Sequence, residues 1–215
     1  MTSAPDDTDD TMLRIDPENM ARGEMYFLLN SIIVPRPIAW ISTVSPTGVA
    51  NIAPHSYTTV ASISPPTLLF VSIGRKDTVT NLEAHGEFVV NTVNYALAER
   101  MNITAADAPP SISEFELAEL KLAPSSVVTP PRVADSPVAL ECTVTDIHAL
   151  GSDPSFVVYG RVEAVHVARR LFDAQGRVDP IELDAVARMG GSMYSTTRDQ
   201  FSLVRPSYAD LKADQ

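Results

Sequence analysis

Cysteine is almost missing from this chain of 215 residues, in which Cys142 is the only one. A single cysteine excludes an intrachain disulfide and the paired cysteines of a CxxC metal or redox site. Apolar and polar residues alternate around Cys142, so we predict a buried thiol in a strand rather than a reactive nucleophile.

Long apolar runs are also missing. No run approaches the roughly 20 apolar residues that a membrane-spanning helix needs. The polar N-terminal segment has no apolar core of the kind that a secretory signal requires. We therefore expect a soluble, cytoplasmic protein.

Positive charge is scarce. The chain has 16 Lys plus Arg against 27 Asp plus Glu, which gives a formal net charge of −11. Such a protein repels nucleic acid and anionic membranes at long range, so neither is an expected partner. A site for a phosphate group therefore has to be built locally.

Common catalytic and nucleotide-binding motifs are absent as well. The sequence has no GxGxxG after a strand, no GxxxxGK[ST], no GxSxG and no HExxH. The four histidines have no close metal-ligand spacing, so we expect no metal site. No catalytic side chain can be named from these patterns.

The predicted elements indicate one domain. We expect a disordered acidic tail over residues 1–17, a single domain over 18–207 and a C-terminal tail over 208–215. Short helices are expected at 18–31, 78–85, 96–101 and 181–188. Strands are expected at 38–44, 49–52, 57–63, 68–73, 87–93, 138–150 and 156–168. Because no regular long helices separate these strands, the pattern predicts a mainly β barrel with short peripheral helices rather than a doubly wound α/β sheet.

Two segments together indicate a site for a planar ring that carries a phosphate. The first, Ala53-Pro54-His55-Ser56-Tyr57, is turn-forming and rich in hydroxyl groups. The second, Gly74-Arg75-Lys76-Asp77-Thr78, follows an apolar strand and begins a helix that Asp77 or Thr78 can cap. Backbone N–H groups at a helix start attract anions, and Arg75 and Lys76 add positive charge there.

Other residues have two interpretations each. Arg36, held between two prolines, can bind an anion or a carboxylate of a second subunit, or it can face solvent. Trp40 can pack in the core or form a wall for an aromatic ligand. His55 can touch a ligand or lie exposed in a turn. Tyr194, after the paired glycines 190 and 191, can stack on a ring, or its segment can simply end a helix.

Four segments in order resemble the flavin reductase-like family, which has an FMN-binding split β-barrel. They are PRPIAWISTVSPTGVANIAPHSY (35–57), SPPTLLFVSIGRKDTVTNLEAHGEFVVN (64–91), SPVALECTV (136–144) and ARMGGSMY (187–194). The resemblance spans about residues 20–206. It implies a Greek-key-like split barrel with short peripheral helices.

The resemblance also implies a function. A homodimer would hold FMN near its interface and act as an NAD(P)H:flavin oxidoreductase, with NADH or NADPH as the hydride donor. It could supply reduced flavin to a partner monooxygenase or reduce a small-molecule electron acceptor. The alternatives are an FMN-binding electron carrier similar to flavoredoxin and a split-barrel protein that acts on another small molecule.

The resemblance carries the cofactor-binding roles to residues of this chain by position. The implied neighbours of the isoalloxazine ring are Ala53, Pro54, Ser56 and Tyr57, with Trp40, Ser42 and Thr43 on the next strand. Those of the phosphate and ribityl chain are Arg75, Lys76, Asp77 and Thr78, with Asn81 nearby. Met189, Gly190 and Tyr194 are expected on the C-terminal side of the ring, and His55 completes the predicted set.

Overall fold

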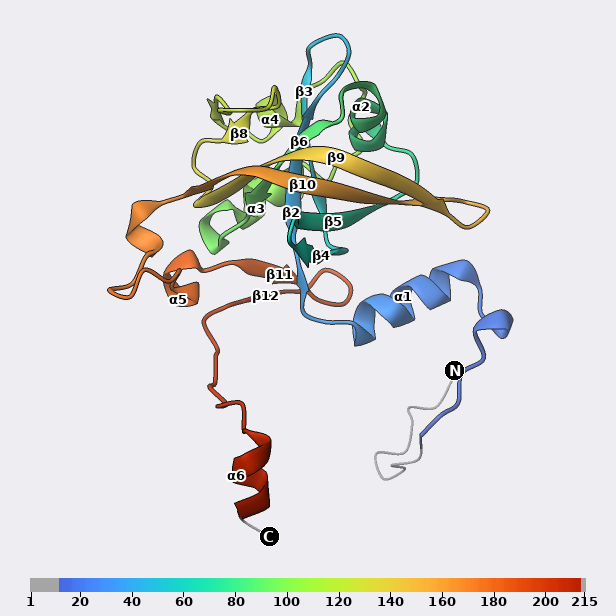
Figure 1. Cartoon of the computed structure of the whole chain (residues 1–215). Coiled ribbons are helices and arrows are strands. Elements are labelled where there is room, and N and C mark those ends of the chain that lie inside the picture. The colour runs from blue at the N-terminus through green and yellow to red at the C-terminus, as the bar shows by residue number, and fades with distance from the viewer. Residues whose placement is uncertain (1–11, 214–215) are drawn as a thin grey trace.

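A computed structural model describes residues 12–213 of the protein (Figure 1). Residues 1–11 of the predicted acidic tail and residues 214–215 of the predicted C-terminal tail lie outside the described residues. The helices are α1 (Arg22–Ile32), α2 (Asp77–His85), α3 (Ala98–Ile103), α4 (Glu114–Leu117), α5 (Pro180–Leu183) and α6 (Tyr208–Ala213). Three single 3-10 turns are η1 (Pro17–Asn19), η2 (Tyr95–Leu97) and η3 (Arg169–Leu171).

Strands make up the body of the molecule. They are β1 (Arg36–Pro37), β2 (Ala39–Val44), β3 (Ala50–His55), β4 (Thr58–Ile63), β5 (Pro66–Ile73), β6 (Glu87–Thr92), β7 (Leu122–Ala123), β8 (Arg132–Val133), β9 (Val138–Leu150), β10 (Ser155–Val167), β11 (Val186–Arg188) and β12 (Tyr194–Thr196). The prediction of a mainly β fold with short helices is confirmed.

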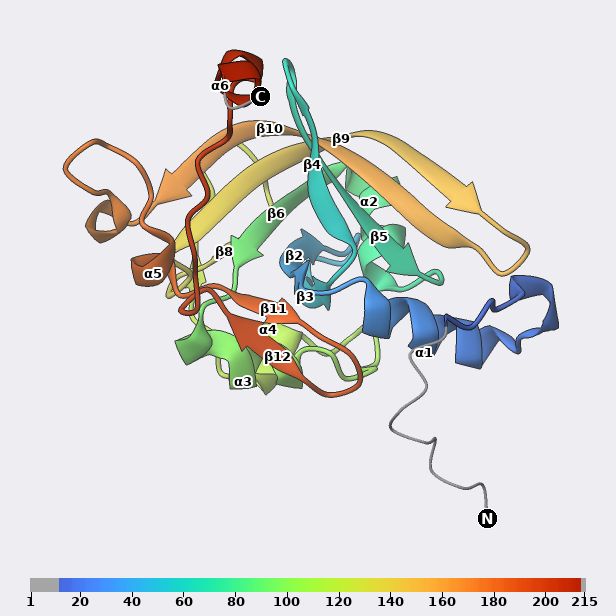
Figure 2. The same cartoon turned by 90° about the horizontal axis from the view of Figure 1, so that it is seen from below.

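Seven of these strands form one antiparallel sheet in the order β3-β2-β6-β9-β10-β5-β4. Figure 2 shows β9 and β10 arching over β2 and β3, so the sheet curls as a barrel does. Strand β1 pairs instead with β11, which pairs with β12 in a separate three-stranded sheet. This second sheet joins the start of the domain to its C-terminal part.

The barrel core is built from apolar residues that alternate along the strands. Phe70, Phe88, Cys142 and Val158 belong to one buried cluster. Cys142 is fully buried on β9, which confirms the predicted buried strand thiol, and this burial raises the pKa of the thiol to about 12. Gly160 lets Phe88 approach the backbone of β10, because a Cβ at residue 160 would lie 2.2 Å from the Phe88 ring.

One predicted helix is wrong. The helix expected over 181–188 ends at Leu183, and Asp184 after it has a left-handed φ of 49°. Val186–Arg188 then forms β11. The apolar pattern of this short stretch fits a helix or a strand. It forms a strand because it pairs with β1 and β12.

No helix within residues 12–213 is long and apolar enough to cross a membrane. The cytoplasmic location expected from the sequence stays a prediction.

Candidate functional site

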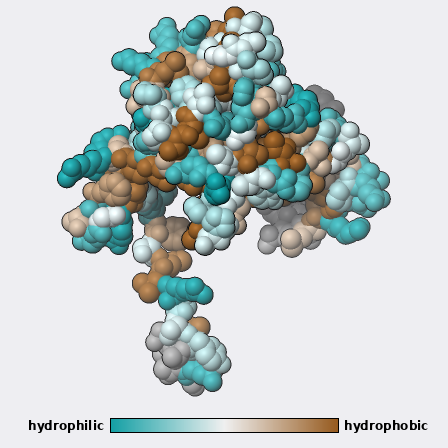
Figure 3. Space-filling model, turned by 45° about the horizontal axis from the view of Figure 1, so that its top comes forward, coloured by the Kyte–Doolittle hydropathy of each residue, from teal (hydrophilic) through white to brown (hydrophobic). Residues whose placement is uncertain are grey.

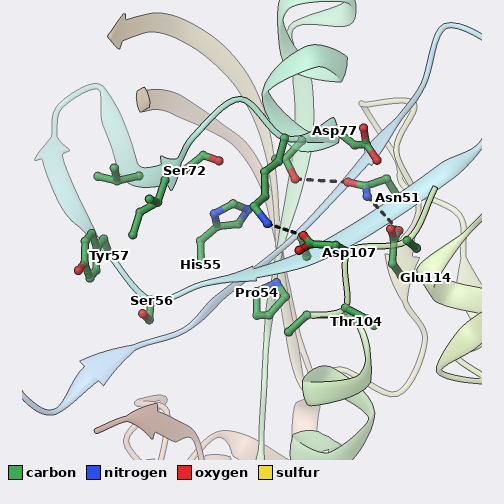
Figure 4. A pocket seen from close by; sticks show the side chains of 18 of the residues that line it. Asn51, Pro54, His55, Ser56, Tyr57, Ser72, Asp77, Thr104, Asp107 and Glu114 are labelled. Atoms are coloured by element: carbon green, nitrogen blue, oxygen red, sulfur yellow. Dashed lines mark hydrogen bonds and ion pairs between the residues drawn. The ribbon is translucent and has the colours of Figure 1, made fainter. Parts of the chain in front are cut away.

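A cavity of about 370 Å³ lies where β3, β5, the start of α2 and the segment 104–114 meet (Figure 4). All five residues of the first predicted segment and the last three residues of the second line it. The predicted residues that line it are Ala53, Pro54, His55, Ser56, Tyr57, Lys76, Asp77 and Thr78. Segments that are far apart in sequence therefore meet as the prediction requires.

The start of α2 forms one end of the cavity. Lys76 is the N-cap residue of this helix, and no side chain caps it, so the expected cap at Asp77 or Thr78 is wrong. The first N–H groups of a helix have no partner within the helix. Lys76, Asp77 and Thr78 all line the cavity, so this helix end brings it the positive end of the helix dipole together with the opposite charges of Lys76 and Asp77.

Two carboxylates neutralise the basic side chains near this helix. The Lys76 Nζ atom lies 2.5 Å from Oδ1 of Asp107, which also lines the cavity. Arg75 pairs with Glu83 and lies over the Phe156 ring, 5.0 Å from its centroid. Arg75 is not among the lining residues, so Lys76 is the nearer candidate for binding a phosphate.

A buried polar network fixes β3 against α2 behind the cavity. Asn51 Oδ1 accepts hydrogen bonds from Thr43 Oγ1 at 3.1 Å and Thr78 Oγ1 at 3.3 Å. Asn51 Nδ2 donates to Glu114 Oε2 at 2.9 Å, and Asn81 Nδ2 donates to Thr43 Oγ1 at 2.9 Å. Thr43 and Asn81 therefore support the lining residues from behind, while Asn51, Thr78 and Glu114 line the cavity themselves.

His55 is the most unusual side chain of the cavity. It is 8% exposed and packs on Phe70 with the ring centroids 4.8 Å apart, so the exposed-turn interpretation is wrong. Burial lowers the pKa of His55 to about 4, against a hydrogen bond to the Val71 backbone that raises it, and the charge of Lys76 lowers it further. Its Nε2 atom is buried and has no hydrogen-bond partner among residues 12–213.

Arg36 has a structural role at the end of α1. It is 6% exposed, so the solvent-facing interpretation is wrong. Its guanidinium donates to the carbonyl oxygens of Asn30 at 2.6 Å, Ile33 at 2.9 Å and Met189 at 3.1 Å. These bonds place a positive charge at the C-terminus of a helix, where the dipole favours it, and tie α1 to the turn after β11.

Trp40 lies in the core rather than on the cavity surface. It is fully buried, and its Nε1 donates to Thr104 Oγ1 at 2.8 Å. Thr104 lines the cavity, so Trp40 holds the wall from behind. Ser42 is also buried and donates to the carbonyl oxygen of Pro131 at 2.5 Å.

The predicted C-terminal contacts lie outside the cavity. Met189 and Gly190 belong to the turn between β11 and β12. Tyr194 bonds through its hydroxyl with Arg188 and donates to Asn102 Oδ1 at 3.2 Å. A cofactor-binding role for these residues, as for every residue of the predicted set, stays a prediction.

The sequence prediction missed the second wall of the cavity. This wall is the segment between α3 and α4, and it contributes Thr104, Ala105, Ala106, Asp107, Ala108 and Pro110. Tyr26 of α1 and Ser72 of β5 line the cavity too. The alternation along β3, which puts Asn51 on the face of Ala53 and His55, was the available signal for Asn51.

Comparison with known proteins identifies the family. The model of the flavin reductase like domain matches residues 31–182, so the chain belongs to this family. Family membership supports an oxidoreductase function and a flavin cofactor.

Solved structures agree with this assignment. Nitrilotriacetate monooxygenase component B from Bacillus cereus is 34% identical, with a TM-score of 0.86 over 91% of this chain and 100% of that one. The 2-nitrobenzoate 2-nitroreductase NbaA of Pseudomonas fluorescens is 30% identical, with a TM-score of 0.85 over 91% of this chain and 98% of that one. A protein with a split barrel domain from Shewanella frigidimarina is 22% identical, with a TM-score of 0.80 over 92% of this chain and 100% of that one. This likeness confirms the split-barrel fold.

Proposed function

We propose that this protein is an FMN-dependent NAD(P)H:flavin oxidoreductase that binds FMN in the cavity between β3, β5 and α2. The observation that carries the proposal is that one cavity holds both the uncapped start of α2, with Lys76, and the buried Nε2 of His55, which has no hydrogen-bond partner among residues 12–213. Helix starts bind phosphate, and a buried nitrogen without a partner calls for a polar ligand.

The dimensions of the cavity suit a cofactor. Its volume of about 370 Å³ falls within the roughly 300–1,000 Å³ typical of small-molecule sites. Ala53, Pro54 and Tyr57 offer apolar surface for a ring, while Thr78 and Ser56 offer hydroxyl groups for the polar parts. These residues fit a ligand that is planar at one end and hydroxylated and anionic at the other, as FMN is.

Each part of the chain has a separate task in this proposal. Lys76 and the first N–H groups of α2 bind the phosphate, and Thr78 bonds to the ribityl chain. Ala53, Pro54 and the Tyr57 side chain orient the ring and keep water from one of its faces. Bound FMN supplies the chemistry, which is acceptance of a hydride from NADH or NADPH.

A similar protein supports one proposed destination for the electrons. Component B of nitrilotriacetate monooxygenase is named as part of a monooxygenase, and this chain matches all of it. By analogy, reduced flavin from this protein would serve a partner monooxygenase or a small-molecule acceptor.

The protein acts as a homodimer with FMN near the interface in this proposal. Apolar side chains that are left in water support a second copy: on α1, Phe27 and Ile32 are each 63% exposed. Phe201 and Leu203 lie on the C-terminal segment that projects from the body in Figure 3, and they are 88% and 83% exposed. Tyr26 of α1 lines the cavity, so a copy packed on this helix would lie beside the flavin.

Anaerobic titration of the FMN-loaded protein with NADH and then NADPH tests the proposal. We expect one nucleotide to bleach the flavin absorbance band within the dead time of manual mixing or over seconds. If FMN binds and neither nucleotide bleaches it, the protein is an electron carrier rather than a reductase. If no FMN binds, the remaining alternative is a split-barrel protein that acts on another small molecule. Sedimentation in the same buffer tests the dimer, which a monomeric mass with FMN bound would contradict.

A further inference from the structure

We propose that Nε2 of His55 accepts a hydrogen bond from the imide N–H (N3–H) of the flavin ring, so that His55 selects and orients the ring. The inference rests on the proposed function and names the atom through which the cavity recognises its ligand.

The first observation is a buried nitrogen without a partner. Nε2 of His55 lies among the residues that line the cavity, on a side chain that is more than nine-tenths buried. Leaving a buried polar atom unbonded costs about 1–3 kcal/mol, and native proteins rarely leave such atoms unbonded. A ligand that bonds with Nε2 would remove this cost.

The second observation fixes what kind of ligand group Nε2 can accept. The backbone of Val71 bonds with the His55 ring and raises its pKa, which identifies the ring as the donor to a carbonyl oxygen. Because Nε2 has no partner, that donor is Nδ1–H. A neutral imidazole with its proton on Nδ1 has only a lone pair on Nε2, so the ligand has to supply an N–H or O–H group.

The third observation is that the His55 ring has a fixed position. His55 is the last residue of β3 and pairs with Ala39 of β2. Its ring packs on Phe70 and bonds with the backbone of Val71 in β5. The acceptor atom cannot follow a ligand, so the ligand has to place its donor there.

The flavin ring offers one matching group. Oxidised isoalloxazine has a single ring N–H, at N3, and reduction leaves it in place. The hydroxyl groups and the phosphate belong to the ribityl chain, and their counterparts in the cavity are Thr78, Lys76 and the start of α2. In Figure 4 the His55 ring lies between Tyr57 and Ser72 on one side and Asp107, Asn51 and Glu114 on the other. From this central position, the His55 side chain is placed to contact the edge of a bound flavin ring.

The test compares FMN with N3-methyl-FMN on the wild-type protein and on His55→Leu, which keeps an apolar side chain of similar size without the acceptor. The His148→Leu variant, whose side chain is 58% exposed on β9, is the matched control. We expect His55→Leu to weaken FMN binding about 10-fold and to leave N3-methyl-FMN binding unchanged. Equal losses for both flavins would overturn the assignment.

A second measurement needs no variant. In protein with ¹⁵N-labelled histidine, the Nε2 resonance of His55 should move toward the hydrogen-bonded range when FMN is added and stay in place with N3-methyl-FMN. If the wild-type protein binds FMN and the resonance does not move, the assignment to His55 is overturned and the proposed function stands. If the protein binds no flavin, both are overturned.

Discussion

Acidification should destabilise this protein through His55. The unfolded chain binds a proton at His55 with a pKa near 6.5, whereas burial lowers the pKa of the folded group to about 4. Between these two values the unfolded state binds more protons than the folded state, so the free energy of unfolding falls as the pH falls. Above pH 6.5 both states are neutral at this ring and the stabilisation is complete.

The size of the effect follows from the shift. One pKa unit corresponds to 1.36 kcal/mol, so a shift from 6.5 to about 4 gives about 3 kcal/mol across the whole window. This is a large share of the roughly 5–15 kcal/mol that holds a typical domain folded.

Urea unfolding at intervals between pH 7 and 4.5 measures this loss. The informative quantity is the difference in unfolding free energy between the wild-type protein and His55→Leu, because the titration of all other groups cancels in it. We expect the difference to shrink by about 2 kcal/mol or more over this range. The His148→Leu variant should follow the wild-type curve. Parallel curves for wild type and His55→Leu would refute the burial of a neutral His55.

Three further predictions concern other parts of the chain. Gly160→Ala should destabilise the protein by about 1–3 kcal/mol in urea unfolding, because the new methyl group meets the buried Phe88 ring. Glu141→Ala should cost about 3 kcal/mol or more, because the fully buried Glu141 carboxylate accepts bonds from three backbone N–H groups that would lose their partner. Asp107→Asn should strengthen binding of FMN about 3-fold and leave riboflavin unchanged, because it frees Lys76 for the phosphate, and fluorescence titration with both flavins measures this.

Each of these has a contrary outcome. An unchanged unfolding midpoint in Gly160→Ala would mean that the Phe88 ring can move aside. A Glu141→Ala variant as stable as wild type would mean that water replaces the carboxylate. Equal effects of Asp107→Asn on FMN and riboflavin would separate the ion pair from phosphate binding, and Asp153→Asn, on an exposed residue paired with Arg22, is its control.

The local pattern of apolar and polar residues predicted most of the strands and helices. The strand predicted at 138–150 coincides with β9, because apolar and polar residues alternate from Leu140 to Thr145, which is the period of a strand. The helix predicted at 181–188 was wrong, because the three apolar or small residues after Asp184 fit a strand as well as a helix. The pairing with β1 that decides the matter joins residues about 150 positions apart, such as Arg36 and Arg188.

The same limit applies to the candidate site. Ala53–Tyr57 and Lys76–Thr78 could be predicted because each has a local signature of turn, hydroxyl or helix start. Thr104 and Glu114 could not, because their places depend on the hydrogen bonds Trp40–Thr104 and Asn51–Glu114, across 64 and 63 residues of chain. Nothing in the irregular composition of their own segment indicates these contacts.

The most direct test of the account is FMN binding to a protein whose cavity has been filled. Ala106 is exposed and lines the cavity, so Ala106→Trp should fold normally and obstruct the site, while Ala174→Trp on an exposed turn is the matched control. FMN titration followed by absorbance should show binding to the wild-type protein and to Ala174→Trp, and a loss of at least 10-fold in Ala106→Trp. Equal affinity in all three proteins would contradict the placement of flavin in this cavity.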